Sequence, residues 1–282
     1  MEQQVKGSLM FRGLIGAVLV IPLGAIVVFG SPSECIGDGP RSCFVVHCEP
    51  TNASDGMFLE LEKLVELAGR FSVPLTIYFT PQWAEMILAD PQKLSVAEAW
   101  VDAGHELGAH HHAYWATKDR AATWDGYTNT SILDLEEMDR DSYLGTMSDA
   151  LDLWNALPGE CTSGCLGLDE GDRADWPCTL RYQTYGHALE EAVSTPRQVS
   201  YEGCVAWAIT HALIIQPQGA LPELYESTSF DRIFCVVGHV YNFEEDRSRF
   251  EFWFRFLQSQ DPAGDRRRTV TRLLQAWEND GA

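Results

Sequence analysis

Twelve residues, GHELGAHHHAYW (residues 104–115), hold three adjacent histidines in a chain of 282 residues that has only eight. The apolar pattern of HELGAH predicts a short strand, and Gly104 before it is a residue that commonly ends a helix. Imidazole is the commonest metal ligand in proteins and titrates near neutral pH. Three histidines at a strand end therefore indicate either a metal and proton-transfer site or a solvated loop, and the other candidate ligands distinguish the two.

Strand-like apolar runs alternate with amphipathic helical segments along the rest of the chain. Strands are expected at residues 43–50 (CFVVHCEP), 73–79 and 232–243 (RIFCVVGHVYNF), with shorter ones within 199–209 and 212–216. Helices are expected at residues 57–71, 81–88, 95–103, 247–258 and 267–278, with one or two within 133–157, and residues 158–176 are expected to be irregular. This alternation is typical of a largely parallel sheet, either a barrel or a doubly wound sheet.

Three of the predicted strands end in side chains that bind metals. The first ends at His47 and Glu49, the HELGAH strand runs into His110 and His112, and the last ends at His239. Sites in parallel α/β folds form where the carboxyl ends of strands meet, so we expect these residues to be close in space. Alternate residues of an extended segment share one side. A glutamate and two histidines on one side predict a site for Zn²⁺ or a similar divalent ion with an open position for water, suited to hydrolysing an amide or ester.

Three motifs carry a resemblance to a known family: GHELGAH (residues 104–110), PLTIYFTPQWAEMI (residues 74–87) and CVVGHVYNF (residues 235–243). With the helix after the first strand, they resemble the polysaccharide deacetylase superfamily, also called the NodB-homology or carbohydrate esterase 4 group, over residues 44–258. The resemblance implies an α/β fold, a distorted (β/α) barrel of about seven strands. It also implies a divalent ion, held by one carboxylate and two histidines, that assists removal of N-acetyl groups from sugars.

Two positions depart from the family's pattern. The first family histidine falls on His110, but four residues later, where the second is expected, the chain has Tyr114. The first strand, which has an acidic pair in the family, reads His47, Cys48, Glu49. His112 or His111 can supply the missing ligand, and imidazole can act as a base near neutral pH. Alternatively, Cys48 binds the metal as a thiolate, or the site has lost its activity.

The residues and the resemblance together give one assignment. We expect metal ligands at Glu49, His110 and His112, a catalytic base at His47, a catalytic acid at His239, and substrate contacts at Tyr114 and Trp115. The predicted function is metal-dependent removal of N-acetyl groups from an extracellular or cell-surface glycan. The alternatives are a non-catalytic glycan-binding ectodomain with a degenerate site and a structural surface protein whose histidines are incidental. His105 is expected to be structural, and His187 and His211 receive no role.

The N-terminus predicts export. Residues 13–30 (GLIGAVLVIPLGAIVVFG) contain no charge and follow a basic segment, as in a transmembrane anchor or a signal segment. The charge distribution places residues 1–12 in the cytoplasm, with residues 31–42 as a linker and residues 43–282 as the deacetylase-like domain outside. The protein is therefore expected to be anchored to a membrane by its N-terminal helix, with an extracellular domain, or secreted. The net charge of −21 makes nucleic acid a poor partner.

An even number of cysteines, eight, indicates disulfides in an exported protein. We expect Cys35 to pair with Cys43, and two of Cys161, Cys165 and Cys178 to pair, with a zinc knuckle of these three as the alternative. Buried free thiols are expected at Cys48, Cys204 and Cys235. The arginines at residues 266–268 are expected to be solvated.

Overall fold

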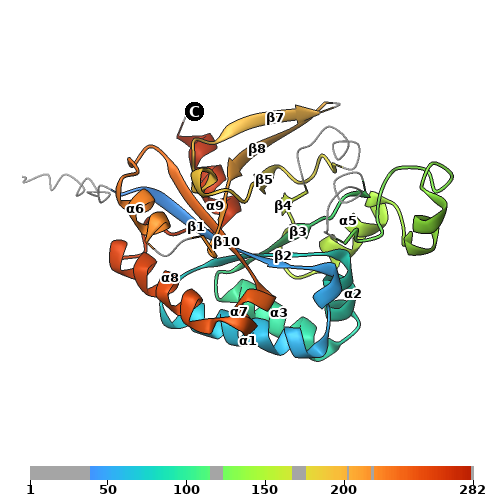
Figure 1. Cartoon of the computed structure of the whole chain (residues 1–282), viewed down its shortest axis with the longest axis horizontal. Coiled ribbons are helices and arrows are strands. Elements are labelled where there is room, and N and C mark those ends of the chain that lie inside the picture. Colours follow the sequence, from blue (N-terminus) through green and yellow to red (C-terminus); the bar gives the residue numbers. More distant parts are fainter. Residues whose placement is uncertain (1–38, 115–122, 167–175, 202, 217–218, 281–282) are drawn as a thin grey trace, which may run out of the picture. The chain divides into compact units, whose positions relative to one another are not determined.

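Within the residues that the computed structural model describes (39–114, 123–166, 176–201, 203–216 and 219–280), ten strands form one curled mixed sheet (Figure 1). The strands are β1 Arg41–Cys48, β2 Leu75–Phe79, β3 Glu106–His110, β4 Ser163–Cys165, β5 Tyr182–Tyr185, β6 Val193–Ser194, β7 Arg197–Tyr201, β8 Cys204–Thr210, β9 Ala212–Leu213 and β10 Ile233–His239. The helices are α1 Asp55–Arg70, α2 Pro81–Leu88, α3 Pro91–Asp102, α5 Met147–Ala156, α6 Ala220–Glu226, α7 Val240–Glu245, α8 Arg247–Gln260 and α9 Val270–Asn279. Short 3-10 helices are η1 Pro50–Asn52, η2 Glu137–Ser142 and η4 Leu189–Ala192.

The order of the strands confirms the predicted distorted barrel. The sheet runs β6-β10-β1-β2-β3-β4-β5-β8-β7. Its seven described strands from β10 to β8 are parallel, and β6 and β7 lie antiparallel at the two ends. β8 pairs with β5, and β9 directly after it pairs with β10. The segment that contains β8 and β9 therefore pairs with β5 near one end of the parallel strands and with β10 at the other end, which curls the sheet toward a barrel.

The side chains of β1 show how the two faces of the sheet differ. Phe44, Val46 and Cys48 belong to the larger apolar cluster, with residues of α1, α2, α3, α7 and α8. Cys43 and Val45 belong to a second cluster, inside the curled sheet, to which α9 contributes. A central parallel strand is covered on both faces, which explains the continuous apolar run of this segment. In Figure 1, α1, α3, α7 and α8 lie along one side of the sheet.

The helix ends follow local chemistry. The Ser54 side chain accepts from the Met57 N–H and begins α1, and Gly104, with φ +94°, follows α3. The segment 133–157, predicted to hold one or two helices, contains only η2 and α5. A capping box between Thr146 and Asp149 begins α5 late in that segment. Residues 158–176, expected to be irregular, include the short strand β4.

The cysteine predictions need correction. Cys178 forms a disulfide with Cys204, so Cys204 is not a free thiol. Cys178 lies just before β5, the neighbour of β8, which brings together two residues 26 apart in sequence. Cys161 and Cys165 form no disulfide with each other, and the predicted zinc knuckle is also wrong because Cys178 is in the disulfide.

Cys43 is a buried free thiol rather than half of a disulfide. It lies opposite Cys235 in the pairing of β1 with β10, inside the sheet. Cys35 lies outside the described residues. The apolar run that buries β1 therefore also buries Cys43, the first residue of the strand predicted at residues 43–50.

The arginines before α9 are not all solvated. Arg266 and Arg267 are buried, and their backbone N–H groups donate to Asp261 Oδ2 over 3.0 and 3.1 Å. The Arg267 guanidinium donates to the Phe71 carbonyl at 3.0 Å. Asp261 neutralises this charge, which is why burial is tolerated.

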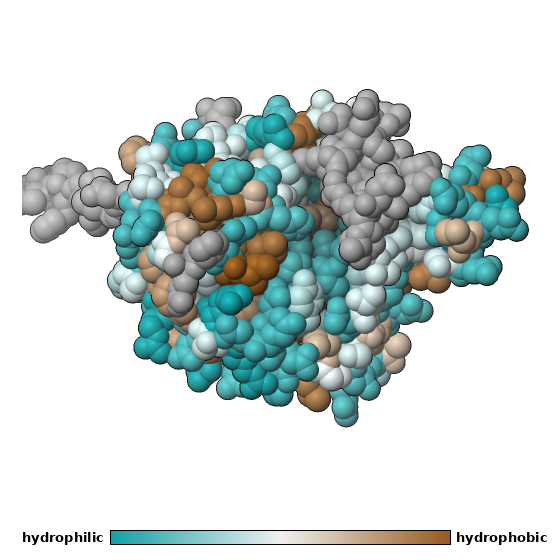
Figure 2. Space-filling model, viewed as in Figure 1, coloured by the Kyte–Doolittle hydropathy of each residue, from teal (hydrophilic) through white to brown (hydrophobic). Residues whose placement is uncertain are grey.

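The described surface is mostly hydrophilic on the face shown in Figure 2, as the net charge of −21 predicts. Exposed large apolar side chains are found at Leu59, Ile132, Leu133, Met138, Leu144, Val205, Ile215, Phe230 and Phe252. No helix in the described part of the chain is long and apolar enough to cross a membrane. The predicted segments 1–12 and 13–30, and most of the 31–42 linker, lie outside that part.

Candidate metal centre

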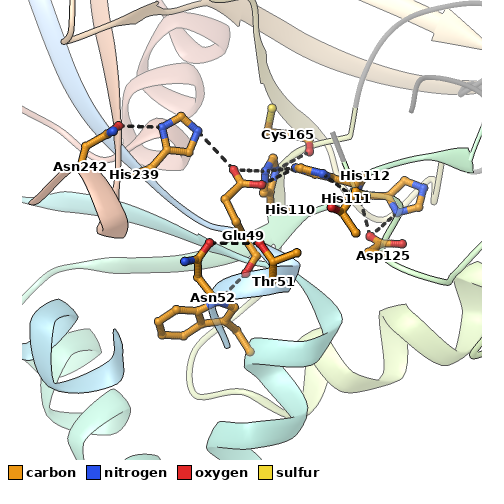
Figure 3. Close-up of polar contacts among 12 residues, drawn as sticks. Glu49, Thr51, Asn52, His110, His111, His112, Asp125, Cys165, His239 and Asn242 are labelled. Atoms are coloured by element: carbon orange, nitrogen blue, oxygen red, sulfur yellow. Dashed lines mark hydrogen bonds and ion pairs between the residues drawn. The ribbon is translucent and has the colours of Figure 1, made fainter. Parts of the chain in front are cut away.

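Four strand or loop ends bring the predicted ligands to one place (Figure 3). β10, β1, β2 and β3 are consecutive parallel neighbours, so their carboxyl ends share an edge of the sheet. His47 is the second-last residue of β1, which ends at Cys48 and leads into Glu49, while β3 ends at His110 and β10 ends at His239. His47 lies opposite His239 in the strand pairing. His112 follows β3 in the adjoining loop.

The Glu49 carboxylate is the centre of this group. Its Oε1 lies 3.3 Å from His110 Nε2 and 3.2 Å from His239 Nε2. Its Oε2 lies 2.7 Å from His112 Nε2. Burial alone would raise the pKa of Glu49, but hydrogen bonds with the three imidazoles lower it well below the ordinary value. Glu49 is therefore an ionised carboxylate at neutral pH.

Backbone carbonyls orient two of the imidazoles. His110 Nδ1 lies 3.1 Å from the Cys165 carbonyl, and His112 Nδ1 lies 2.8 Å from the Thr123 carbonyl. A carbonyl only accepts, so each Nδ1 donates, and the Nε2 of each neutral ring carries a lone pair. The two Nε2 atoms are 3.0 Å apart and both face Glu49. Two facing lone pairs repel each other unless a proton or a cation lies between them. Histidines that bind metals commonly donate their other ring N–H to a backbone carbonyl, as His110 and His112 do here.

The protonation tendencies of the two rings differ. Burial lowers the pKa of His110 despite the neighbouring carboxylate. Burial also opposes the charged form of His112, but the hydrogen bond and charge of Glu49 outweigh it and raise its pKa. The ligand atoms of Glu49, His110 and His112 lie within 4.8 Å of one another. These residues fit a divalent ion bound by one carboxylate and two histidines.

Asp125 holds the histidine loop in place, although no role was predicted for it. His111 Nδ1 lies 2.7 Å from Asp125 Oδ2, and both side chains are fully buried. The backbone N–H of His112 donates to the same oxygen over 3.0 Å, and that of Tyr127 donates to Oδ1 over 3.1 Å. His111 therefore faces away from Glu49 and is not a ligand. Asp125 follows no predicted strand, so the strand-end rule could not find it.

His47 lies beneath the other histidines. His47 is 1% exposed, and the centroid of its ring lies 4.1 Å from that of the His110 ring and 5.3 Å from that of the His239 ring. Burial, and then the neighbouring imidazoles, lower its pKa well below the ordinary value. This neutral ring has a lone pair, but its burial separates it from solvent. A role as catalytic base therefore requires an intermediary.

His239, on the opposite side of Glu49, is oriented by its own neighbour. Its Nδ1 lies 3.2 Å from Asn242 Oδ1, which leaves Nε2 directed at the carboxylate. Its ring stacks on Tyr241 with centroids 4.9 Å apart. The geometry of His239 accommodates either a proton donor or a ligand.

Two further histidines lie next to this group, although no role was assigned to them from the sequence. His211 is fully buried between β8 and β9, with its ring centroid 5.3 Å from that of His47. His187 follows, 5.9 Å from the His211 ring. His211 comes directly after a predicted strand, and the rule applied to the other strand ends would have found it.

The remaining predicted residues have other environments. Tyr114 is buried, and its hydroxyl donates to Asp139 Oδ2 at 3.0 Å, so it anchors a loop rather than lining an open surface. Trp115 lies outside the described residues. His105 Nδ1 accepts from the Leu75 N–H at 3.0 Å, a structural contact as predicted.

Comparison with known proteins bears on the fold. No family model matches the chain, and no curated protein matches it. The crystal structure of a Mycobacterium smegmatis protein assigned as a polysaccharide deacetylase is similar over 86% of this chain and 92% of that one, with a TM-score of 0.52 and 10% identity. This chain has the polysaccharide deacetylase fold. A 4-alpha-glucanotransferase from Thermococcus litoralis is similar over 83% of this chain but 38% of its own, with a TM-score of 0.50 and 11% identity.

Proposed function

We propose that the protein is a metal-dependent hydrolase that removes N-acetyl groups from a glycan outside the cytoplasm. One observation carries the proposal: the Nε2 atoms of His110 and His112 lie 3.0 Å apart and face the Glu49 carboxylate. Each ring donates its other N–H to a backbone carbonyl. These three residues would hold the ion. A divalent ion bound there lowers the pKa of a water molecule and polarises an amide carbonyl.

The openness of the group favours catalysis over a structural role. Structural zinc sites are closed by four protein ligands, whereas catalytic sites use three and keep one position open. The side chains of Glu49 and His112 are 13% and 16% exposed, so the group reaches the surface of the described structure. His110 lies behind them at 6%. Substrate would therefore approach from the side of Glu49 and His112.

A glycan substrate is supported by the fold and by one aromatic residue. The Mycobacterium smegmatis protein of the same fold is a polysaccharide deacetylase by name, and the Thermococcus litoralis protein is a glucanotransferase. Tyr241, partly exposed, stacks on the ring of His239 at the same group. Sugar rings pack against such aromatic faces, so Tyr241 would position a sugar beside Glu49.

A location outside the cytoplasm is supported by the Cys178–Cys204 disulfide. Disulfides persist in oxidising compartments and are rare where thiols are kept reduced. Proteolysis of intact cells, followed by detection of the domain, tests this part of the proposal. Cleavage without cell lysis supports it, and full protection until lysis contradicts it.

The experiment that tests the function measures metal content and acetate release on the purified full-length chain. N-acetylated chito-oligosaccharides and peptidoglycan serve as substrates. We expect wild type to bind metal and release acetate, and His112→Ala to bind less metal and release no acetate. His187→Ala is the matched control, because it removes an exposed imidazole outside the Glu49 group. Metal binding without acetate release from any N-acetylated glycan would contradict the hydrolase and favour the glycan-binding alternative.

A further inference from the structure

We propose that Glu49 bridges two metal ions, the first held by His110 and His112 and the second by His47 and His239. The inference rests on the proposed metal-dependent function and adds a second ion to the same centre. Two-metal sites place their ions about 3.5–4 Å apart and clamp both oxygens of a reacting group. The argument comes from how the ligand atoms are grouped around the carboxylate.

Three groups of candidate ligands lie among the described residues, and two of them share Glu49; the third, His47, His110 and Cys165, contains no carboxylate. The ligand atoms of Glu49, His110 and His112 lie within 4.8 Å of one another, and so do those of His47, Glu49 and His239. Ligand atoms on one zinc ion, each about 2.0–2.2 Å from it, are separated by no more than about 4.4 Å. No group among the described residues combines all five side chains within 4.8 Å. One ion therefore reaches one set, and small side-chain rotations bring each set to coordination distance.

The two carboxylate oxygens contact both sets. Oε2 lies 2.7 Å from His112 Nε2 of the first set, whereas Oε1 lies 3.2 Å from His239 Nε2 of the second set and 3.3 Å from His110 Nε2 of the first (Figure 3). Asn242 Oδ1 accepts from His239 Nδ1, which leaves the His239 Nε2 directed at the carboxylate. A lone pair on that nitrogen and a carboxylate oxygen repel each other unless a proton or a cation lies between them. The same argument from facing lone pairs assigned His110 and His112 as ligands of the first ion.

His47 supplies an independent observation. Its Nε2 is buried and has no hydrogen-bond partner in the part of the chain that the structure describes. Buried polar atoms are almost always satisfied by protein, water or an ion, so an orphaned nitrogen beside a carboxylate calls for an explanation. The partner of His47 in the strand pairing is His239, the other ligand of the second set. A second ion satisfies both rings.

This assignment competes with the sequence-based roles of His47 as base and His239 as acid. A ring nitrogen bound to an ion cannot donate a proton, so the two roles are exclusive. If His239 is a proton donor, its replacement abolishes acetate release and leaves the metal content unchanged. If it is a ligand, its replacement removes one ion.

The test loads the metal-stripped full-length chain with Zn²⁺ and measures bound zinc by equilibrium dialysis and elemental analysis. We expect two equivalents for wild type and for His187→Ala, and one equivalent for His239→Asn and for His47→Gln. His112→Ala is expected to lose the first ion. Because His47 and His239 are both buried, circular dichroism checks the folding of both variants, and His239→Asn repeats the test at the second ligand.

A second measurement on wild type needs no variant. Loading with Mn²⁺ is expected to give an electron paramagnetic resonance spectrum of two exchange-coupled ions. One equivalent of zinc at saturation, with the spectrum of an isolated Mn²⁺, overturns the second ion and leaves the proposed function standing. Absence of any bound metal overturns both proposals. Two equivalents that persist in His239→Asn also overturn the assignment of its ligands.

Discussion

Replacing Asp125 with asparagine should destabilise the protein and weaken its metal site, although Asp125 is no ligand. Its Oδ2 accepts from His111 Nδ1 and from the His112 N–H, and its Oδ1 accepts from the Tyr127 N–H. Asparagine keeps one of the two oxygens. Its NH₂ group therefore faces a donor, and the fully buried His111 loses its carboxylate.

The magnitude follows from these contacts. Hydrogen bonds to charged groups are worth about 1.5–3 kcal/mol each, and removing one partner of a buried pair costs about 3–5 kcal/mol. Because Asp125→Asn keeps the shape and one acceptor, we expect a loss of about 3 kcal/mol in unfolding free energy. At this chain length, that corresponds to a fall of about 6–12 °C in the thermal midpoint. Replacing a residue that orients a metal ligand weakens metal affinity by about 10–100-fold.

Urea unfolding of the metal-free protein measures the stability, and zinc titration measures the affinity. Asp139→Asn is the matched control, because Asp139 is a partly exposed carboxylate in η2 that accepts a hydrogen bond from Tyr114. We expect the control to lose less than about 1 kcal/mol. Equal losses in the two variants, or an unchanged zinc affinity in Asp125→Asn, would refute the idea that Asp125 orients the histidine loop.

Three further outcomes are expected. Burial lowers the pKa of His105 to about 4, whereas its pKa in the unfolded chain is about 6.5, so between these pH values only the unfolded chain binds the proton. As the pH falls through this window, the unfolding free energy of the wild type should drop by about 3 kcal/mol more than that of His105→Asn, as measured by urea unfolding. Gly108→Ala would place a Cβ 2.7 Å from a backbone oxygen of β4 and should lower the unfolding free energy by about 1–3 kcal/mol. Gly69→Ala adds a Cβ where no atom lies within 4 Å, so it should leave stability unchanged or raise it. A thermal melt in which Gly69→Ala is the less stable variant contradicts this packing. Reducing Cys178–Cys204, which closes a loop of 26 residues, should remove about 3.5 kcal/mol, and Cys178→Ser/Cys204→Ser should be insensitive to the reductant.

The sequence predicted the centre of the fold well because that centre is buried on both faces. β1 and β10 are largely apolar runs, and each carries a histidine at or next to its carboxyl end, His47 and His239. Short strands gave no comparable signal. β4, of three residues, and β5, of four, carry polar residues and depend on their neighbours for their pairing.

The site was predictable only where a residue followed a recognisable strand. Glu49, His110 and His239 meet that condition, and the structure brings them together. Asp125 does not, since a turn and the partner His111 determine its position. The pairing of Cys178 with Cys204 depended on the adjacency of β5 and β8, a long-range property that spacing along the chain does not encode.

The strand order has a consequence for biosynthesis. β1 lies next to β10, the last strand in chain order within the described part of the protein. A chain synthesised only as far as β9 contains Glu49 without His239, so these two side chains come together only after β10 has been made. Pairing across such a separation in sequence is slow, because loop closure precedes the contacts that reward it. An unfinished chain therefore carries only part of the proposed ligand set.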